Sequence, residues 1–333
     1  MKLSSNTLLL AFLDEWLVRI KPIIKPSTWE TYQLIVKGKI EPYFSDCNKH
    51  IKDYVPYDFS EFFCYLAEKG NYKSQTGLSR KSVKNIRSVL SSSFEFALQN
   101  SILKMNPVIS SSMPAFANRL DPDVPQYTAQ QVHDLLGFAK ESHSHIYVFL
   151  LLALFTGLRK GELMALTWAD IDFNKNTLRV NKSRTGKKTS VSNEITTPKT
   201  KSSNRVVPLN DLTIEALRTE REKQLLQYNS SKPDDYIIKN IHGLPYSNLS
   251  AINRVVNRLT EKAGLPHCTI HGFRHSVATI LDENGVPLQE ISILLGHESI
   301  VTTEKLYIRR RRTAKKETID ILSSAIISDK NNL

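Results

Sequence analysis

A stretch without hydrophobic periodicity divides this chain of 333 residues into two differently patterned parts. From Asn106 to Pro125 the sequence is rich in serine, proline and asparagine, which is typical of an exposed linker. Helical spacing dominates before this stretch, and short β-like runs join the helical ones after it. Because a single core rarely serves more than about 250–300 residues, the pattern predicts domains at residues 1–115 and 126–333, joined by a linker at 116–125.

The N-terminal part is predicted to be entirely helical. Its first apolar stripe recurs every four residues, as on one face of an amphipathic helix, at Leu8, Phe12, Trp16 and Ile20. Ser27 and Glu30 have the spacing of a capping box and predict a second helix just after Pro26. Pro42 is expected to end the segment that follows, and a third helix is expected from about Asp58.

A helix from Ser79 to about Gln99 combines an apolar face with a basic one. The cations near its start are Arg80, Lys81, Lys84 and Arg87. A basic helix face is most often simply solvated. Here contact with phosphate is expected as well, because a domain that helps to grip a nucleic-acid duplex needs cations facing the backbone.

The C-terminal part begins with a helix capped by Thr128. A strongly apolar helix follows from Ile146 and is broken by Gly157. Three short β-like runs come next, separated by turn-rich segments such as 184–187, and helices return after Pro208. These runs are Thr177–Val180, Val191–Thr197 and Arg205–Leu209. The fold class is therefore predicted to be α+β, mainly helical with a small antiparallel sheet in the second domain.

Composition restricts the partners. Lys and Arg exceed Asp and Glu by 12 and the isoelectric point is near 9.4, which favours a polyanion. The three cysteines form no CxxC pair, as in proteins of a reducing cytosol. No secretory signal is evident, and the longest apolar run, at 146–155, is well short of the about 20 residues that span a bilayer. A cytoplasmic protein without a membrane partner is expected.

Six residues in the second part form an ordered set suited to phosphodiester chemistry: Arg159, Lys199, His271, Arg274, His297 and Tyr307. The planar guanidinium donates paired hydrogen bonds to phosphate oxygens and keeps its charge, so two arginines can clamp one phosphate. His271 and Arg274 lie three apart at an expected helix start and therefore share a face. Glu162, three residues after Arg159, is expected to hold a neighbouring guanidinium or imidazole in place.

A phenol is the candidate nucleophile. Its pKa is near 10, so attack by Tyr307 at neutral pH requires a base or a cationic field, which His271 and the arginines can supply. His297 is better placed to hydrogen-bond the phosphate. The departing oxygen needs a proton, for which Lys199 is favoured, although Lys201 in the same turn is the alternative if the hairpin register differs by one residue.

A metal site is not expected. His271 and His275 have the i, i+4 spacing of helical metal ligands, but a second cation, Arg274, lies beside them, and no cysteine or carboxylate motif accompanies them. The histidines at 133, 143 and 145 lead to the same conclusion.

Four strings that carry these residues resemble the tyrosine recombinase (phage integrase) family, and the resemblance extends over nearly the whole chain. They are TGLRKGEL (156–163), TPKTKSSNRVVPL (197–209), HGFRH (271–275) and LLGHESIVTTEKLY (294–307). The second string, TPKTKSSNRVVPL, looks more like integrases of phages and conjugative elements than like the chromosome-dimer resolvases, which have a shorter hairpin. Tyr307 is followed by Ile308 and Arg309, whereas many relatives have a histidine two residues beyond the tyrosine.

The resemblance implies a site-specific recombinase that integrates or excises a mobile element. Tyr307 would form a covalent 3′-phosphotyrosine and leave a free 5′ hydroxyl, and attack by another strand's hydroxyl would rejoin the backbone without metal, ATP or other cofactor. The expected partner is double-stranded DNA at attachment sites, clamped between a helical core-binding domain and a catalytic domain in a homotetramer. Accessory DNA-bending or excision factors are further partners that the resemblance suggests.

Several alternatives stay open at this level. Many phage integrases begin with a small arm-binding domain, and this chain begins directly in the helical one, as a simpler type or a truncated form would. The apolar helix expected after the basic run Arg309–Arg312, within 314–326, can pack on its own domain or on a neighbouring subunit. The rival functions are a DNA-binding protein that has lost cleavage and a topoisomerase that relaxes one duplex by the same chemistry.

Overall fold

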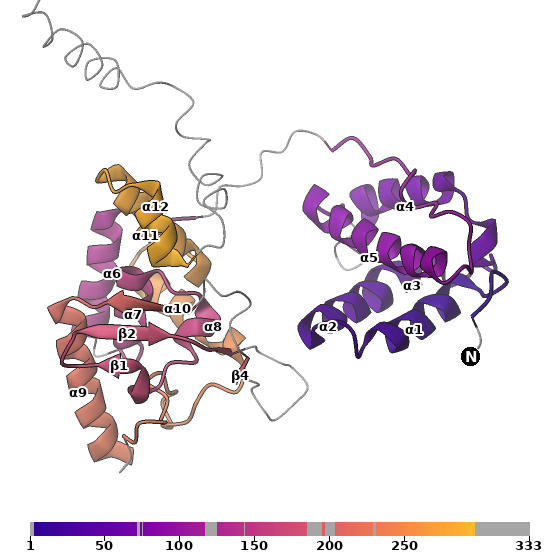
Figure 1. Ribbon diagram of the computed structural model, residues 1–333. Coiled ribbons are helices and arrows are strands. Elements are labelled where there is room, and N and C mark those ends of the chain that lie inside the picture. The colour runs from indigo at the N-terminus through magenta and orange to yellow at the C-terminus, as the bar shows by residue number, and fades with distance from the viewer. Residues whose placement is uncertain are drawn as a thin grey trace, which may run out of the picture. The chain divides into compact units, whose positions relative to one another are not determined.

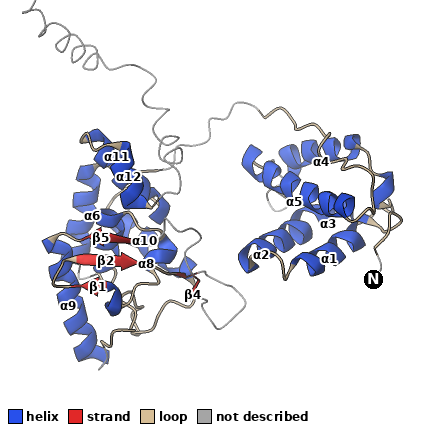
Figure 2. Cartoon of the chain, viewed as in Figure 1, coloured by secondary structure: helices blue, strands red, loops and turns tan. Residues whose placement is uncertain are grey.

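The computed structural model describes residues 3–71, 74, 76–116, 125–142, 144–184, 195–196, 204–228 and 231–296. The chain divides into two compact units, Met1–Pro122 and Asp123–Leu333 (Figures 1 and 2). The first is helical and the second combines helices with short antiparallel strands. This agrees with the predicted α+β fold class. None of the helices in the described part of the chain has the length and apolar character of a membrane span.

The N-terminal unit is built from short helices around an aromatic core. Its α-helices are α1 (Leu9–Ile20), α2 (Pro26–Ile35), α3 (Glu41–Phe44), α4 (Pro56–Lys69) and α5 (Arg80–Gln99). Phe94 of α5 lies between Phe12 and Phe59, with ring centroids 5.8 and 5.2 Å away. Burial of each such ring contributes about 1.5–3 kcal/mol, so these contacts hold α5 against α1 and α4.

Three details of this unit differ from the sequence prediction. No capping box forms at Ser27, because α2 already begins at Pro26, with Lys25 as its N-cap residue. Proline suits the first helical turn, where its missing N–H is not needed. For the same reason Pro42 does not end the chain segment around it: it lies in the first turn of α3, directly after a π-helical turn at Val36–Ile40. The third predicted helix starts at Pro56, two residues earlier than expected.

The C-terminal unit packs helices around a small sheet. Its described helices are α6 (Ala129–Glu141), α7 (Tyr147–Thr156), α8 (Lys160–Leu163), α9 (Asp211–Tyr228), α10 (Leu249–Lys262), α11 (Ile270–Glu283) and α12 (Leu288–Leu295). The apolar helix α7 is buried in the centre, where it contacts α6, α9 and α11. Helices α11 and α12 lie together at one end of the unit, beyond the sheet (Figure 1).

The sheet pairing was not evident in the sequence. Strands β1 (Ile171–Asp172), β2 (Thr177–Val180) and β5 (Arg205–Pro208) form one antiparallel sheet in the order β1-β2-β5. Strands β3 (Ser183–Arg184) and β4 (Ile195–Thr196) form a separate pair. Arg184 therefore belongs to a strand rather than to the turn predicted at 184–187, and the second β-like run does not lie between the other two.

The segment that enters the C-terminal unit is fastened to α11. The backbone N–H of Tyr127 donates to Oγ of Ser276 at 2.6 Å, and Thr279 donates to the side chain of Gln126 at 2.7 Å. A side chain at Gly272 would collide with the carbonyl oxygen of Pro125, so glycine is needed there. These contacts set the position of α11, the helix that carries His271 and Arg274.

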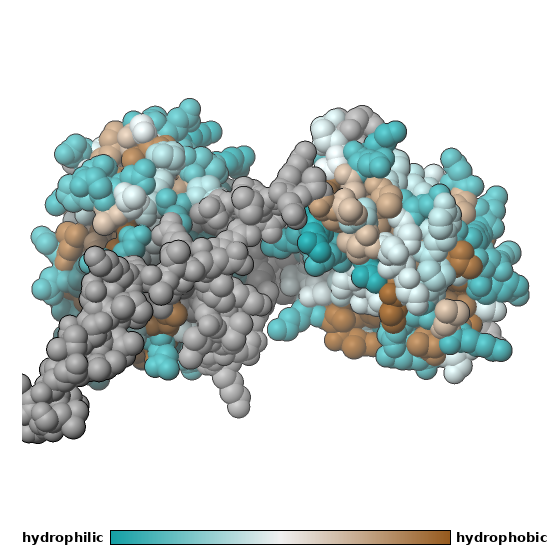
Figure 3. Space-filling model, turned by 90° about the horizontal axis from the view of Figure 1, so that it is seen from above, coloured by the Kyte–Doolittle hydropathy of each residue, from teal (hydrophilic) through white to brown (hydrophobic). Residues whose placement is uncertain are grey.

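The surface of each unit is mainly hydrophilic on the face that Figure 3 shows. Apolar residues form smaller patches among the hydrophilic ones.

Candidate active site

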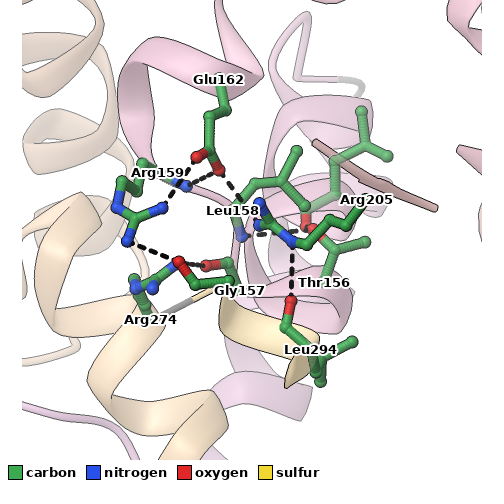
Figure 4. Close-up of polar contacts among 10 residues, drawn as sticks. Thr156, Gly157, Leu158, Arg159, Glu162, Arg205, Arg274 and Leu294 are labelled. Atoms are coloured by element: carbon green, nitrogen blue, oxygen red, sulfur yellow. Dashed lines mark hydrogen bonds and ion pairs between the residues drawn. The ribbon is translucent and has the colours of Figure 1, made fainter. Parts of the chain in front are cut away.

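The candidate site is built on the chain reversal at the end of α7. Gly157 follows the last residue of α7 with a φ of +61°, a conformation that residues other than glycine rarely adopt. A side chain there would also collide with Leu295 of α12. The reversal brings Arg159 to the N-terminus of the short helix α8, facing the ends of α11 and α12 (Figure 4).

Glu162 is the centre of the polar network. Its carboxylate is buried, with a side chain that is only 3% exposed. One oxygen accepts a hydrogen bond from Nη1 of Arg159 at 2.9 Å, and the other accepts from the Arg159 backbone N–H at 3.0 Å and from Nη2 of Arg205 at 3.1 Å. Burial raises the pKa of this carboxyl, but the attraction of Arg205 and Arg159 outweighs it, so the pKa lies below its usual range. Glu162 therefore stays ionised and orients two guanidiniums.

Arg274 reaches the same place from α11. Its Nη1 donates to the carbonyl oxygen of Gly157 at 2.7 Å, and the residue is 4% exposed. Its Nη2 is buried, and among the residues that the structure describes no oxygen accepts a hydrogen bond from it. Burial, and then repulsion from Arg159, lower the pKa of Arg274 to about 9, so the group keeps its charge at neutral pH.

The cluster carries more positive than negative charge. Of the three guanidiniums drawn in Figure 4, those of Arg159 and Arg205 hydrogen-bond to the carboxylate of Glu162, whereas Arg274 bonds to the carbonyl oxygen of Gly157. One carboxylate is therefore the only anionic partner that the described network holds for three cations. Burial of a cation without a counter-ion costs free energy, and a bound anion would offset that cost. Arg159 remains the most accessible of the three, with 42% of its side chain exposed. The arrangement is therefore suited to binding a phosphate.

The two histidines of α11 differ from each other. The rings of His271 and His275 lie edge to face, with centroids 4.5 Å apart. Burial, then the proximity of His271 and Arg274, lower the pKa of His275 to about 4, so His275 is neutral at physiological pH. His271 lies at the start of the helix and is exposed, whereas its neighbour Gly272 is buried. Within the described ranges, no group of three or more His, Cys, Asp or Glu residues is arranged to bind a metal ion.

Four of the predicted site residues, Lys199, Lys201, His297 and Tyr307, lie outside the described residues, as does the predicted helix within 314–326. The described chain ends at Gly296, the residue before His297. The carbonyl oxygen of Gly296 accepts a hydrogen bond from Nη2 of Arg159 at 2.9 Å. The structure thus brings together Arg159, Glu162 and Arg274 of the predicted set and places the chain just before His297 against them.

The predicted DNA-contacting cations lie at the start of α5. Arg80, Lys81 and Lys84 are exposed, and none of them is paired with a carboxylate within the described part of the unit. Arg87 differs, because its Nη2 donates to the carbonyl oxygens of Val108, Ile109 and Ser111 at 3.4, 2.9 and 3.3 Å. Arg87 is thus half-buried and holds the segment after α5, whereas contact with phosphate stays a prediction for all four cations.

The sequence reasoning missed Arg205. It treated this residue only as the start of a strand, although alternation along β5 places its side chain on the same inward face as that of Val207. An arginine on the inward face of a strand requires hydrogen-bond acceptors inside the fold. This position was the one feature of the sequence that could have indicated a role for Arg205. Without the pairing of β2 with β5 and the position of α12, nothing in the sequence identifies those acceptors.

Comparison with known proteins identifies the family to which the chain belongs. Residues 126–313 match the phage integrase family, and residues 9–66 match its N-terminal SAM-like domain. A XerC-like tyrosine recombinase of Caldanaerobacter subterraneus is 30% identical over 274 residues, which cover 74% of this chain and 68% of the relative. The ICEBs1 integrase of Bacillus subtilis is 28% identical over 307 residues, covering 91% of this chain and 79% of the relative.

A solved structure shares the fold. The Tn1549 transposon integrase in complex with a circular intermediate DNA superposes with a TM-score of 0.75 at 21% identity, covering 96% of this chain and 100% of that one. The family match extends over more than half of the residues and includes the guanidinium cluster described above. The chain therefore belongs to the phage integrase family and is a tyrosine recombinase.

Proposed function

We propose that this tyrosine recombinase is a site-specific integrase that breaks and rejoins duplex DNA through a covalent 3′-phosphotyrosine on Tyr307. The observation that carries the proposal is the charge of the buried cluster. Three guanidiniums face one carboxylate, and Nη2 of Arg274 is buried without an acceptor among the described residues. A phosphodiester supplies both a negative charge and the missing acceptor oxygens, which suits the geometry and the donors of arginine.

The proposed reaction is a pair of transesterifications. Arg159 and Arg274 clamp the non-bridging oxygens of the scissile phosphate, and the phenolic oxygen of Tyr307 attacks phosphorus. The 5′ oxygen leaves with a proton from Lys199, or from Lys201 in the alternative register, while His271 accepts the proton of the phenol. Attack by a 5′ hydroxyl of another strand then releases the tyrosine. Each step exchanges one P–O bond for another, so no external energy source is required.

Glu162 supports this clamp without touching the substrate. Its carboxylate already engages one edge of the Arg159 guanidinium, and Gly296 engages Nη2, so the group is held in one orientation. Donors that are oriented in advance need no reorganisation when charge develops in the transition state. His297, the next residue after Gly296, is proposed to donate a further hydrogen bond to the same phosphate.

The two units are proposed to act as a core-binding domain at 1–115 and a catalytic domain at 126–333 that grip the duplex together. Exposed Arg80, Lys81 and Lys84 at the N-terminus of α5 provide cations where the helix dipole also favours phosphate. By family resemblance, the active assembly is a homotetramer on two attachment sites, with accessory DNA-bending or excision factors. Integration and excision of a mobile element are favoured because one relative is named the ICEBs1 integrase and a structural neighbour is a transposon integrase.

The direct test is trapping of the covalent intermediate. The protein is incubated with nicked duplexes that carry the ends of the element, and a protein–DNA adduct is sought on a denaturing gel. An adduct that depends on the end sequence supports the site-specific enzyme. Binding without any adduct would favour a DNA-binding protein that has lost cleavage. Relaxation of a plasmid that lacks attachment sites would favour the topoisomerase.

The salt dependence of DNA binding is expected to be steep. Each phosphate that the protein neutralises releases counter-ions, and the logarithm of the affinity falls by about 0.9 per contact for each tenfold rise in salt. The variant Lys84→Gln should therefore show a slope shallower by about that amount. Lys37→Gln is the matched control, because Lys37 is also exposed but its ammonium lies 3.0 Å from both Asp14 and Glu41. Equal slopes for Lys84→Gln and the unmodified protein would remove Lys84 from the DNA interface.

A further inference from the structure

Arg205 is an arginine on the inward face of a β-strand. It is the first residue of β5 and pairs with Val180 across the sheet. The next residue, Val206, is 64% exposed, whereas the Arg205 side chain is only 9% exposed, as the alternation of a strand requires. A charged group in this position is stable only if its donors find acceptors. Nε and Nη2 have found acceptors, and both belong to the candidate active site, whereas Nη1 is buried and has none among the described residues.

The Arg205 guanidinium joins two separate parts of that site. Its Nη2 donates to Glu162 at 3.1 Å, and its Nε donates to the carbonyl oxygen of Leu294 at 3.0 Å (Figure 4). Leu294 belongs to the last turn of α12, where backbone carbonyls have no partner within the helix and a cation is favourable. One side chain therefore connects α8 with the end of α12.

The guanidinium also shapes the turn after α12. A side-chain carbon at Gly296 would lie 2.7 Å from Nη1 of Arg205 and 2.9 Å from Cζ, so the turn closes over the guanidinium only because residue 296 is glycine. Gly296 has a φ of +64°, and its carbonyl oxygen accepts from Arg159. Arg159 thus binds the carbonyl oxygen of Gly296 and Arg205 that of Leu294, and both guanidiniums also bind Glu162.

We infer that Arg205 is a positioning residue for strand cleavage: it locks Glu162 and the end of α12 together, so that Arg159 and the chain leading to His297 are presented to the phosphate in one arrangement. This inference rests on the proposed function. Lysine is not an adequate replacement, because one ammonium lacks the planar fork that serves a carboxylate and a carbonyl at once.

A positioning role predicts a change in pH dependence that a purely structural role does not. The charged groups that act on Glu162 are Arg159 at the start of α8, Arg205 on β5 and Arg274 on α11. Removal of the Arg205 charge leaves the burial of Glu162 in place and removes a main attraction, so the pKa of the carboxyl should rise. A protonated Glu162 has lost its charge and holds the Arg159 guanidinium less firmly, so cleavage by the variant should decline on the acidic side, where the unmodified enzyme is still active.

The experiment compares Arg205→Met and Arg205→Lys with the unmodified enzyme under single-turnover conditions. DNA affinity and cleavage rate are measured separately, the rate with protein in saturating excess over DNA and as a function of pH. Arg205→Met is expected to cleave roughly 10²-fold more slowly, the scale for a catalytic group displaced by about 1 Å, with an affinity close to that of the unmodified enzyme. Its rate should increase with pH over a range in which the unmodified rate is flat. Arg205→Lys should fall between the two.

Arg184→Met is the matched control. Arg184 is 2% exposed and donates to the backbone carbonyls of Met164 and Tyr246, so its loss removes a comparable buried cation on the neighbouring strand pair without removing a bond to Glu162. At a temperature where both variants are folded by circular dichroism, the control should retain its rate and its pH profile. Equal losses in the two variants, with no change of profile, would reduce Arg205 to a structural residue.

Two further results separate the possible failures. If Arg205→Met does not fold, Arg205→Lys carries the test, and an unmodified rate and profile in that variant would overturn the inference. In a double-mutant cycle, Arg205→Met should cost much less in the background of Glu162→Gln, because the two residues act as a unit; independent effects would contradict the inference. Absence of cleavage by the unmodified protein on end-containing DNA would instead count against the proposed function.

Discussion

Replacement of Tyr307 by phenylalanine is expected to abolish the covalent protein–DNA adduct while DNA binding is retained. The substitution removes one oxygen, which is the proposed nucleophile, and leaves the aromatic ring and the guanidinium cluster unchanged. Without that oxygen no P–O bond to the protein can form, so the loss should be complete rather than partial. The measurement is the fraction of nicked substrate linked to protein on a denaturing gel, with affinity determined in parallel by gel shift.

Tyr228→Phe is the control for this experiment. Tyr228 ends helix α9, where its ring lies against Gly243 and below Lys239, outside the guanidinium cluster. The same single oxygen is removed there, and the yield of adduct should not change. Persistent adduct formation by Tyr307→Phe would place the nucleophile on another residue, and loss of DNA binding would show that the hydroxyl has a role in affinity.

Replacement of Arg274 by alanine is expected to slow cleavage by at least ~10²-fold, the scale for removal of one donor that is already oriented toward the reacting group. Arg274 is held by Gly157 through Nη1, so Nη2 is directed without any rearrangement. Arg274→Lys restores a charge, but a single ammonium cannot bind the Gly157 carbonyl and bridge two phosphate oxygens in the same way. We therefore expect that lysine recovers little of the rate.

The control substitution is Arg218→Ala, because Arg218 lies at the surface of α9 and donates to the carbonyl oxygen of Phe173. Its cleavage rate should match that of the unmodified enzyme. A near-normal rate in Arg274→Ala would exclude Arg274 from the phosphate clamp. The rates are compared in single turnovers with the protein in saturating excess over DNA, so that differences in affinity do not enter.

Arg274 should also affect the stability of the DNA-free protein. Its pKa is lowered to about 9 in the fold, first by burial. Below pH ~9 the guanidinium is charged in both the folded and the unfolded protein, so its burial lowers the free energy of unfolding by the full cost. The cost declines as the pH rises above ~9, because the group can then lose its proton in the folded protein. A bound anion offsets the cost at neutral pH. Inorganic phosphate should accordingly raise the melting temperature of the unmodified protein more than that of Arg274→Ala, and equal shifts would argue against an anion at this site.

The functional motifs were accessible from sequence because their signals are local. Gly157 ends an apolar helix, so Arg159 was expected directly after a break, and that is where it lies. His271 and Arg274 were expected to share the start of a helix, and both belong to the first turns of α11. Thr128 was expected to cap a helix and does so by accepting the backbone N–H of Gln131. In each case the determining interactions lie within about four residues along the chain.

Local patterns in the sequence did not reveal contacts that distant parts of the chain provide. Arg87 looked like a solvent-facing cation of an amphipathic helix, but carbonyl oxygens more than twenty residues away accept its hydrogen bonds. Arg184 looked like part of a turn, yet it is buried in strand β3 between the carbonyls of Met164 and Tyr246. The rules for helix faces and turns describe local preference, and long-range acceptors override it.

The division into a helical part and a mixed part, the resemblance to the tyrosine recombinases and the ordered residues of the candidate site could all be recognised in the amino-acid sequence. The pairing of β2 with β5, the link that Arg205 makes between Glu162 and the end of α12, and the binding of two guanidiniums by one buried carboxylate became visible in the folded chain. Periodicity and caps depend on neighbours in the chain. The partner of a buried charge depends instead on which distant backbone oxygens the packed helices and strands bring within hydrogen-bonding distance.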